Sequence, residues 1–316
     1  MDVSIALATY NGAQHLRQQL DSIARQTELP IELVVSDDNS PDATLAVIED
    51  FAHTAPFEVR VLPRHERLGF SDNFLHAAEH CRSPLVMFCD QDDVWLPEKL
   101  AISRRRLIED DSLIVLHTLT LADENMRPFG HLSQSIERTR VYEALELKPF
   151  LCGYGNTMTF RSELLRLVPR GLRPQADGRT LSHDTWIYTL AAALGRATHL
   201  TDSYILYRQH GANVSHLDSR SRWQKLVDVA TFDAAGHRDK AEFNRAMAAI
   251  FFRIDSAKAA ECYRQREAAI RLRLEVFGAP TFARRFSSFL SLSERRSLPF
   301  LKNLLLGVLG AGRRRD

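Results

Sequence analysis

Short apolar runs alternate with amphipathic stretches along the first hundred residues of the chain. The runs predict four strands, at residues 3–7, 31–35, 57–61 and 85–89. Between the strands, apolar side chains recur at helical spacing, as at Leu16, Leu20 and Ile23. Strands that alternate with helices of this length predict an α/β fold, in which a mostly parallel sheet with right-handed crossovers is flanked by helices.

The pattern is less regular beyond residue 97. It predicts helices at 97–107 and 183–194 and strands at 113–121, 153–160 and 204–207. The polar segments 122–150 and 169–181 predict loops, and the length of the first is typical of a mobile loop over a site. From about residue 216 the sequence is rich in Ala, Arg and Glu, which predicts a helical C-terminal region.

Three carboxylates follow the fourth strand within four positions. Residues 84–97 read PLVMFCDQDDVWLP, so that Asp90, Asp92 and Asp93 stand at the end of a buried strand. Carboxylates packed together without a cation repel one another and resist ionisation. A divalent cation removes this cost, and Mg²⁺ usually binds one or two carboxylates together with phosphate oxygens. The segment therefore predicts an Asp-X-Asp site for a metal and a nucleotide, with a solvated acidic turn as the alternative.

The first two strands also end in polar residues. Thr9, Tyr10 and Asn11 follow the first strand, and Asp37 and Asp38 follow the second. In a parallel sheet these ends share one edge with the carboxylates of the fourth strand, where open α/β sheets bind ligands. A carboxylate accepts a hydrogen bond from a pyrimidine N3–H, and a Tyr ring stacks on the base. We therefore expect a nucleoside at these loops, although Asp and Asn also favour plain turns.

Composition sets limits on the class of protein. The chain has 316 residues, 45% of them hydrophobic and 26% charged, which is typical of a globular protein. No run of 18 apolar residues predicts a membrane span, and the N-terminal sequence Met-Asp-Val-Ser lacks the basic region of a secretory signal. The four scattered cysteines form no Cys-x-x-Cys pair. We therefore expect a reduced, cytoplasmic protein, and we expect no nucleic-acid partner.

The net charge of +1 conceals two unequal parts. Residues 1–215 carry 21 Lys and Arg against 29 Asp and Glu, a net of −8, whereas residues 216–316 carry 20 against 11, a net of +9. In residues 281–316, eight basic residues are interleaved with Phe and Leu. This pattern favours an amphipathic segment on an anionic membrane surface, peripheral on the inner face of the plasma membrane. Packing on the rest of the chain and a dimer contact are the alternatives.

Five blocks stand in order along residues 1–215: ATYN at 8–11, SDDNS at 36–40, DQDDVWLP at 90–97, HDTW at 183–186 and YRQHGANVS at 207–215. Together they resemble the family 2 glycosyltransferases with the Rossmann-like GT-A fold. The last two blocks resemble the rhamnosyltransferase-like branch of that family. The resemblance implies a catalytic domain at 1–215, with a nucleotide-binding half at 1–100 and an acceptor half at 101–215. A helical, basic C-terminal region at 216–316 lies outside it.

The resemblance also implies roles for single residues. The nucleoside would be held by Thr9, Tyr10, Asn11, Asp37 and Asp38. Asp92 stands where such enzymes ligate the metal, and Asp90 stands where they meet the ribose. His210 would complete the metal site and Arg208 would contact phosphate oxygens, whereas a structural histidine and an ion pair are the alternatives. The role of Asp93, which extends the minimal motif, is open.

Asp184 is the expected general base. Inversion by direct displacement needs one base beside the acceptor hydroxyl, opposite the leaving diphosphate. A carboxylate in the first turn of a helix has a fixed position, and the helix dipole favours its ionised form. Capping of the helix is the alternative role for Asp184.

The resemblance implies an inverting hexosyltransferase that needs Mn²⁺ or Mg²⁺. Its donor would be a dTDP- or UDP-sugar, with rhamnose as one candidate sugar. Its acceptor would be a glycan or lipid-linked saccharide in the synthesis of a bacterial surface polysaccharide such as O-antigen. A nucleotidyltransferase usually has a Gly-rich phosphate loop with Lys or Arg, which Thr9-Tyr10-Asn11-Gly12 lacks. A non-catalytic nucleotide-sugar scaffold, the other alternative, has no use for a base.

Overall fold

The computed structural model describes all residues except 64–65, 148–152, 177–178, 211–233 and 279–316. The chain divides into two compact units. The sheet unit comprises Met1–Arg173 and Leu181–Asn213, and the helical unit comprises Pro174–Thr180 and Val214–Asp316. The predicted boundaries at residues 100 and 215 stay predictions.

The sheet unit is built on a ten-stranded sheet with the order β3-β2-β1-β4-β9-β6-β12-β5, in which β7 pairs with β6 and β8 pairs with β12. Its strands are β1 (Val3–Thr9), β2 (Glu32–Asp37), β3 (Glu58–Val61), β4 (Leu85–Cys89), β5 (Val94–Trp95), β6 (Ser112–Ala122), β7 (Pro128–Leu132), β8 (Arg140–Tyr142), β9 (Thr159–Arg161) and β12 (Arg196–Arg208). Its helices are α1 (Ala13–Ala24), α2 (Thr44–Ala52), α3 (Phe70–Glu79), α4 (Lys99–Glu109), α5 (Glu163–Leu167) and α6 (His183–Leu194), with short 3-10 turns η1 (Gly155–Thr157) and η2 (Arg170–Leu172).

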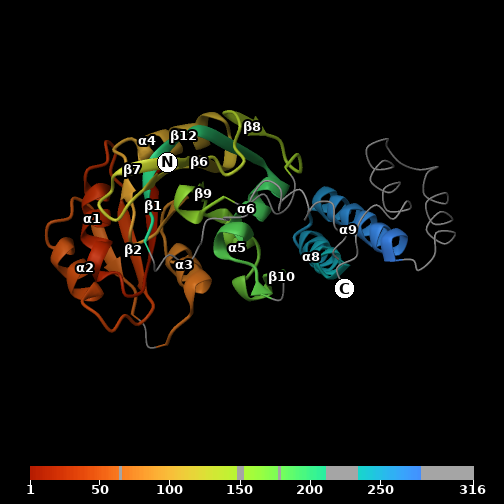
Figure 1. Ribbon diagram of the computed structural model, residues 1–316, viewed down its shortest axis with the longest axis horizontal. Coiled ribbons are helices and arrows are strands. Elements are labelled where there is room, and N and C mark those ends of the chain that lie inside the picture. Colours follow the sequence, from red (N-terminus) through yellow and green to blue (C-terminus); the bar gives the residue numbers. More distant parts are fainter. Residues whose placement is uncertain (64–65, 148–152, 177–178, 211–233, 279–316) are drawn as a thin grey trace. The chain divides into compact units, whose positions relative to one another are not determined.

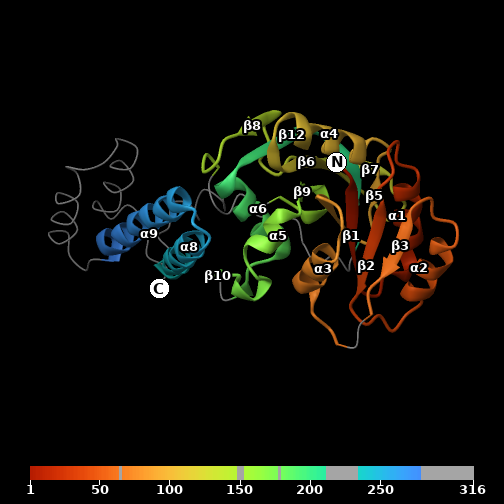
Figure 2. The ribbon, with the colours of Figure 1, turned by 180° about the vertical axis from the view of Figure 1, so that it is seen from behind.

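The first four strands in chain order pair in parallel, from β3 through β2 and β1 to β4, and β6 pairs in parallel with β12. Helices α1 and α2 lie on one side of these first strands and α3 lies on the other (Figure 1; from behind, Figure 2). Leu16, Leu20 and Ile23 of α1 are fully buried, as their helical spacing predicts. Each such side chain contributes roughly 1.5–3 kcal/mol through burial. The predicted α/β fold class is confirmed.

The second half of the sheet departs from the prediction in three places. The strand expected at 153–160 is η1 followed by β9, which runs antiparallel between β4 and β6. The last strand, expected at 204–207, is the 13-residue β12, whose register against β6 shifts twice between Leu200 and Leu206. These irregularities hide the alternation on which the prediction depended. The segment 122–150, expected as a loop, contains the strands β7 and β8.

The helical unit contains a two-stranded hairpin and two helices among its described residues. These elements are β10 (Gln175–Ala176), β11 (Arg179–Thr180), α8 (Ala234–Arg253) and α9 (Ala257–Gly278). Helices α8 and α9 pack against each other through buried Phe243, Phe251 and Tyr263. Among the helices that the structure describes, none is long and apolar enough to cross a membrane. The basic segment 281–316 lies outside the described residues.

Candidate active site

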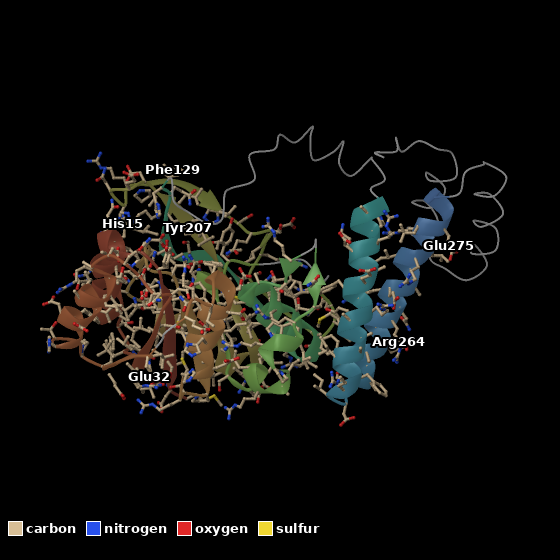
Figure 3. All side chains as sticks on the ribbon, turned by 90° about the horizontal axis from the view of Figure 1, so that it is seen from below. His15, Glu32, Phe129, Tyr207, Arg264 and Glu275 are labelled. Atoms are coloured by element: carbon tan, nitrogen blue, oxygen red, sulfur yellow. The ribbon has the colours of Figure 1, made fainter. Side chains whose placement is uncertain are left out.

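The ends of β2, β1 and β4 meet at one edge of the sheet, as the parallel pattern predicts. In the ladder between β1 and β2, Thr9 stands opposite Asp37, and both are the last residues of their strands. The loop from Asp90 to Asp93 follows β4, the other neighbour of β1. Figure 3 shows His15, just after β1, and Tyr207 of β12 toward this end of the sheet, whereas Glu32, at the start of β2, lies toward the other end. The predicted residues are therefore gathered on one edge.

The two aspartates after β2 organise the loops around them. Asp37 is 5% exposed and accepts hydrogen bonds from Thr9 Oγ1 at 2.8 Å and from the backbone N–H of Ser40 at 2.8 Å. Asp38 is 3% exposed and accepts hydrogen bonds from the backbone N–H groups of Leu68 and Gly69 at 2.7 and 3.0 Å. These contacts hold together the end of β1, the loop after β2 and the segment just before α3. Direct contact of Asp37 and Asp38 with a base stays a prediction.

Tyr10 is held by a residue that the sequence analysis did not single out. Gln91 Oε1 accepts a hydrogen bond from the Tyr10 backbone N–H at 2.9 Å, and Gln91 Nε2 donates to the Tyr10 carbonyl at 2.9 Å. The Tyr10 ring is partly exposed, and the Arg67 guanidinium lies 3.9 Å from its centroid. Asn11 adopts a left-handed backbone conformation with φ 51°, which Asn tolerates better than most residues. The two hydrogen bonds of Gln91 therefore fix the loop after β1 against the loop from Asp90 to Asp93.

Asp92 and His210 meet although 118 residues separate them. Asp92 Oδ2 lies 2.8 Å from His210 Nε2, and both side chains are partly buried. Asp92 comes from the loop after β4, and His210 follows β12 by two residues. The structure thus brings together the two residues that were predicted to bind the metal.

The geometry of this pair fits a divalent cation. With metal–ligand distances of about 2.1 Å, adjacent ligand atoms of an octahedral ion lie roughly 3 Å apart, close to the Asp92–His210 distance. In the part of the chain that the structure describes, no three His, Cys, Asp or Glu side chains gather into a complete metal site. Diphosphate oxygens and water commonly complete the coordination of a nucleotide-bound Mg²⁺.

Asp90 lies beside this pair in an electrostatically unfavourable position. Burial raises the pKa of Asp90 well above its ordinary value, and the nearby carboxylates of Asp93, Asp92 and Asp184 raise it further. No described residue donates a hydrogen bond to its carboxylate. Asp90 is therefore suited to a ligand that supplies a cation or a hydroxyl donor, such as a ribose.

Arg208 is hydrogen-bonded to the loop from Asp90 to Asp93. Its side chain is 1% exposed, and its Nε donates to the Asp92 carbonyl at 2.7 Å. Nη2 donates to Gln18 Oε1 at 2.6 Å, and Nη1 donates to the Glu124 carbonyl. Contact of Arg208 with phosphate stays a prediction, and the geometry indicates a second task, which is to fix the loop that carries Asp92.

Asp184 lies in the first turn of α6, with one carboxylate oxygen held. Oδ1 accepts hydrogen bonds from the Thr185 backbone N–H at 2.6 Å and from Ser182 Oγ. The other oxygen, Oδ2, has no hydrogen-bond partner among the residues described. Asp184 lies near enough to Asp90 to raise the pKa of that group further. One oxygen is thus fixed while the other is available to accept a proton.

His183, next to Asp184, is part of an aromatic cluster. Its ring stacks on Phe74 at a centroid distance of 4.0 Å and meets Phe88 edge-on at 4.8 Å. The side chain is 2% exposed, and burial lowers its pKa to about 4. His183 is therefore a neutral ring at pH 7 that positions the start of α6.

His15 is a second residue near the metal pair that the sequence analysis did not identify. Its ring centroid lies 5.2 Å from that of His210. Partial burial, with Arg208 and His210 nearby, lowers the pKa of His15. Its place in the first turn of the helix after β1, at the ligand-binding edge, was the only signal in the sequence.

Comparison with known proteins identifies the family. The sequence profile of "Glycosyl transferase family 2" matches residues 4–167. The chain belongs to glycosyl transferase family 2. It is 34% identical over 224 residues to the dTDP-rhamnosyl transferase RfbG of Shigella flexneri. This match covers 66% of this chain and 75% of RfbG. It is 25% identical over 109 residues to WfgD of Escherichia coli, a UDP-Glc:alpha-D-GlcNAc-diphosphoundecaprenol beta-1,3-glucosyltransferase, over 34% of this chain and 42% of that protein.

The fold of this family 2 glycosyltransferase is shared with a solved structure. The crystal structure of S. aureus TarS 1-349 in complex with UDP superimposes with a TM-score of 0.55 and 20% identity over 98% of this chain and 81% of TarS. This likeness confirms the GT-A-type fold. Family membership makes the chain an inverting, nucleotide-sugar-dependent glycosyltransferase of the hexosyltransferase type, and the nucleotidyltransferase and scaffold alternatives are set aside.

Proposed function

We propose that this enzyme transfers rhamnose from a dTDP donor to a hydroxyl of a glycan or lipid-linked saccharide in bacterial surface polysaccharide synthesis. The observation that carries the catalytic part is the convergence of Asp90, Asp184 and the Asp92–His210 pair on one sheet edge. The likeness to RfbG and the HDTW and YRQHGANVS blocks support rhamnose. The activity of WfgD supports a lipid-linked acceptor, and a UDP donor is the second candidate.

Each group of side chains has its own role in the proposed reaction. Thr9, Tyr10 and Asn11, with Asp37 and Asp38, enclose the nucleoside, and Asp90 meets the ribose hydroxyls. Asp92 and His210 would hold Mn²⁺ or Mg²⁺, which would neutralise charge on the leaving diphosphate. Asp184 Oδ2 accepts the proton of the acceptor hydroxyl while the hydroxyl oxygen attacks the anomeric carbon of the donor sugar. The diphosphate leaves from the opposite face, and the configuration inverts.

A nucleotide panel tests the donor assignment. Thermal unfolding is measured with dTDP, UDP, GDP and CMP, each with and without Mn²⁺, and transfer from the matching sugar donors follows. We expect dTDP with Mn²⁺ to give the largest rise in Tm, because a ligand that binds only the folded state stabilises it. A metal-dependent rise with UDP alone would replace the dTDP assignment. No rise with any nucleotide would contradict the proposed site.

A further inference from the structure

Asp93 lies one residue beyond the proposed metal ligand, and its side chain is fully buried. Its Oδ1 accepts a hydrogen bond from the Arg208 backbone N–H at 3.1 Å, and its Oδ2 accepts one from Asn156 Nδ2 at 2.6 Å. These partners are 115 and 63 residues away along the chain. A buried carboxylate is costly unless its oxygens are hydrogen-bonded, so Asp93 holds together three segments that the chain itself leaves far apart.

The first link runs to the metal pair. Arg208 donates its backbone N–H to Asp93 and its Nε–H to the Asp92 carbonyl, at 3.1 and 2.7 Å. His210 follows Arg208 by two residues. Two hydrogen bonds from one residue thus fix the loop that carries Asp92 against the strand end that leads to His210. The 2.8 Å separation of Asp92 and His210 depends on this register.

The second link runs to the base. Asn156 lies in η1, beside Gly155, and Lys99 Nζ donates to the Asn156 carbonyl. A Cβ atom at Gly155 would lie 2.6 Å from His183 Nε2 and 3.5 Å from Asp184 Cβ. The turn that Asp93 anchors therefore packs directly against the first turn of α6, where Asp184 stands.

We propose that Asp93 is a positioning residue that holds the Asp92–His210 pair and the base-bearing turn of α6 in register through Arg208 and Asn156. This inference rests on the proposed function, because it gives Asp92, His210 and Asp184 their proposed roles. Substitution of a group that orients metal ligands through hydrogen bonds typically lowers metal affinity or activity 10–100-fold.

Asp93→Asn tests the link with little change in volume. The new amide has one acceptor oxygen for two donors, the Arg208 backbone N–H and Asn156 Nδ2, so at least one of these two hydrogen bonds to a carboxylate oxygen is lost. We expect the Mn²⁺ concentration for half-maximal transfer to rise about 10–100-fold and kcat to fall. Binding of the nucleotide diphosphate without metal, measured by calorimetry, should stay unchanged. If Asp93→Asn does not fold, Asn156→Ala removes the hydrogen bond between Asn156 Nδ2 and Asp93 Oδ2 and leaves Asp93 in place.

The exchanged pair Asp93→Asn with Asn156→Asp provides a rescue. It restores one donor and one acceptor at the same place and keeps one carboxylate near Lys99. We expect it to recover most of the Mn²⁺ dependence and the kcat that Asp93→Asn loses. A folded double variant with no recovery would overturn the proposal.

Glu32→Gln is the matched control, because Glu32 is also a fully buried carboxylate but lies at the other end of the sheet (Figure 3). It accepts hydrogen bonds from Ser4 Oγ and from Arg60. We expect this variant to lose stability while its Mn²⁺ dependence stays that of the wild type. An equal change in Mn²⁺ dependence in Glu32→Gln and Asp93→Asn would show a stability effect alone and overturn the positioning role.

Wild-type transfer measured over a Mn²⁺ series separates this inference from the proposed function. Metal-independent transfer by the wild type overturns the proposed metal site and the positioning role with it. Metal-dependent transfer that Asp93→Asn leaves unaltered overturns only the positioning role.

Discussion

At the scale of single residues, the site depends on groups whose environment decides their chemistry. Asp184 has one oxygen held by Ser182 and Thr185 and the other without a described partner. Its position in the first turn of α6 places the carboxylate near the helix N–H dipoles. A general base requires a carboxylate that is held in place.

Asp184→Asn should abolish most of the transfer activity. The amide cannot accept the acceptor proton, so we expect kcat to fall about 10²–10⁴-fold. The rise in Tm with nucleotide and Mn²⁺ should persist, because the donor groups are intact. The exposed Asp50→Asn is the control for loss of a surface carboxylate. Turnover near that of the wild type in Asp184→Asn would contradict the assignment.

His183 makes stability depend on pH. Burial lowers its pKa from 6.5 to about 4, so between these values the unfolded chain binds more protons than the folded one. Its contribution to stability is therefore complete above pH 6.5 and is lost as the pH falls toward 4, up to roughly 3 kcal/mol. Urea unfolding from pH 7 to pH 4 should show a smaller loss in His183→Phe than in the wild type. Identical pH profiles would contradict this prediction.

At the scale of elements, short segments set the relative positions of the site residues. The turn η1 is three residues long, yet it contacts Asp93 through Asn156 and the start of α6 through Gly155. Neither β5 nor η1 has enough residues to show a period, so the sequence pattern did not predict them. Their conformations follow from the long strands and helices around them.

Gly155→Ala tests this packing. The added methyl would meet His183 Nε2 at 2.6 Å, so the ring or the turn must shift. We expect a loss of about 1–3 kcal/mol in unfolding free energy and a lower kcat, since Asp184 moves with its helix. Gly171→Ala is the control, because an added methyl there meets no atom within 4 Å and should change stability by less than about 0.5 kcal/mol. Equal effects of the two substitutions would contradict the role of η1.

At the scale of the whole molecule, the charge is divided between an acidic N-terminal part and a basic C-terminal part. Residues 1–215 carry a net charge of −8, although the donor and its diphosphate are anionic. A cation at Asp92 and His210 would offset this repulsion locally. The net charge of +9 on residues 216–316 is the basis for the predicted contact with an anionic surface.

The basic segment should bring the enzyme to membranes. We expect the full chain to sediment with vesicles that contain anionic lipid, and a chain without residues 281–316 to stay largely in solution. The difference should shrink at high salt, because each basic residue contributes only about 1 kcal/mol through screened charge. Neutral vesicles are the control. Equal sedimentation of both chains would exclude the segment as the anchor.

The sequence by itself determined the α/β class and the polar strand ends, because periodicity and turn chemistry are local properties. It also predicted Asp90, Asp92 and Asp184 as residues of the site. Only the tertiary structure decided that Asp92 meets His210 and that β9 runs antiparallel between β4 and β6. Such contacts join residues far apart in the chain and depend on the order of the strands. No local pattern encodes that order, so the partners of Asp93 and the double hydrogen bond of Gln91 emerged only from the folded chain.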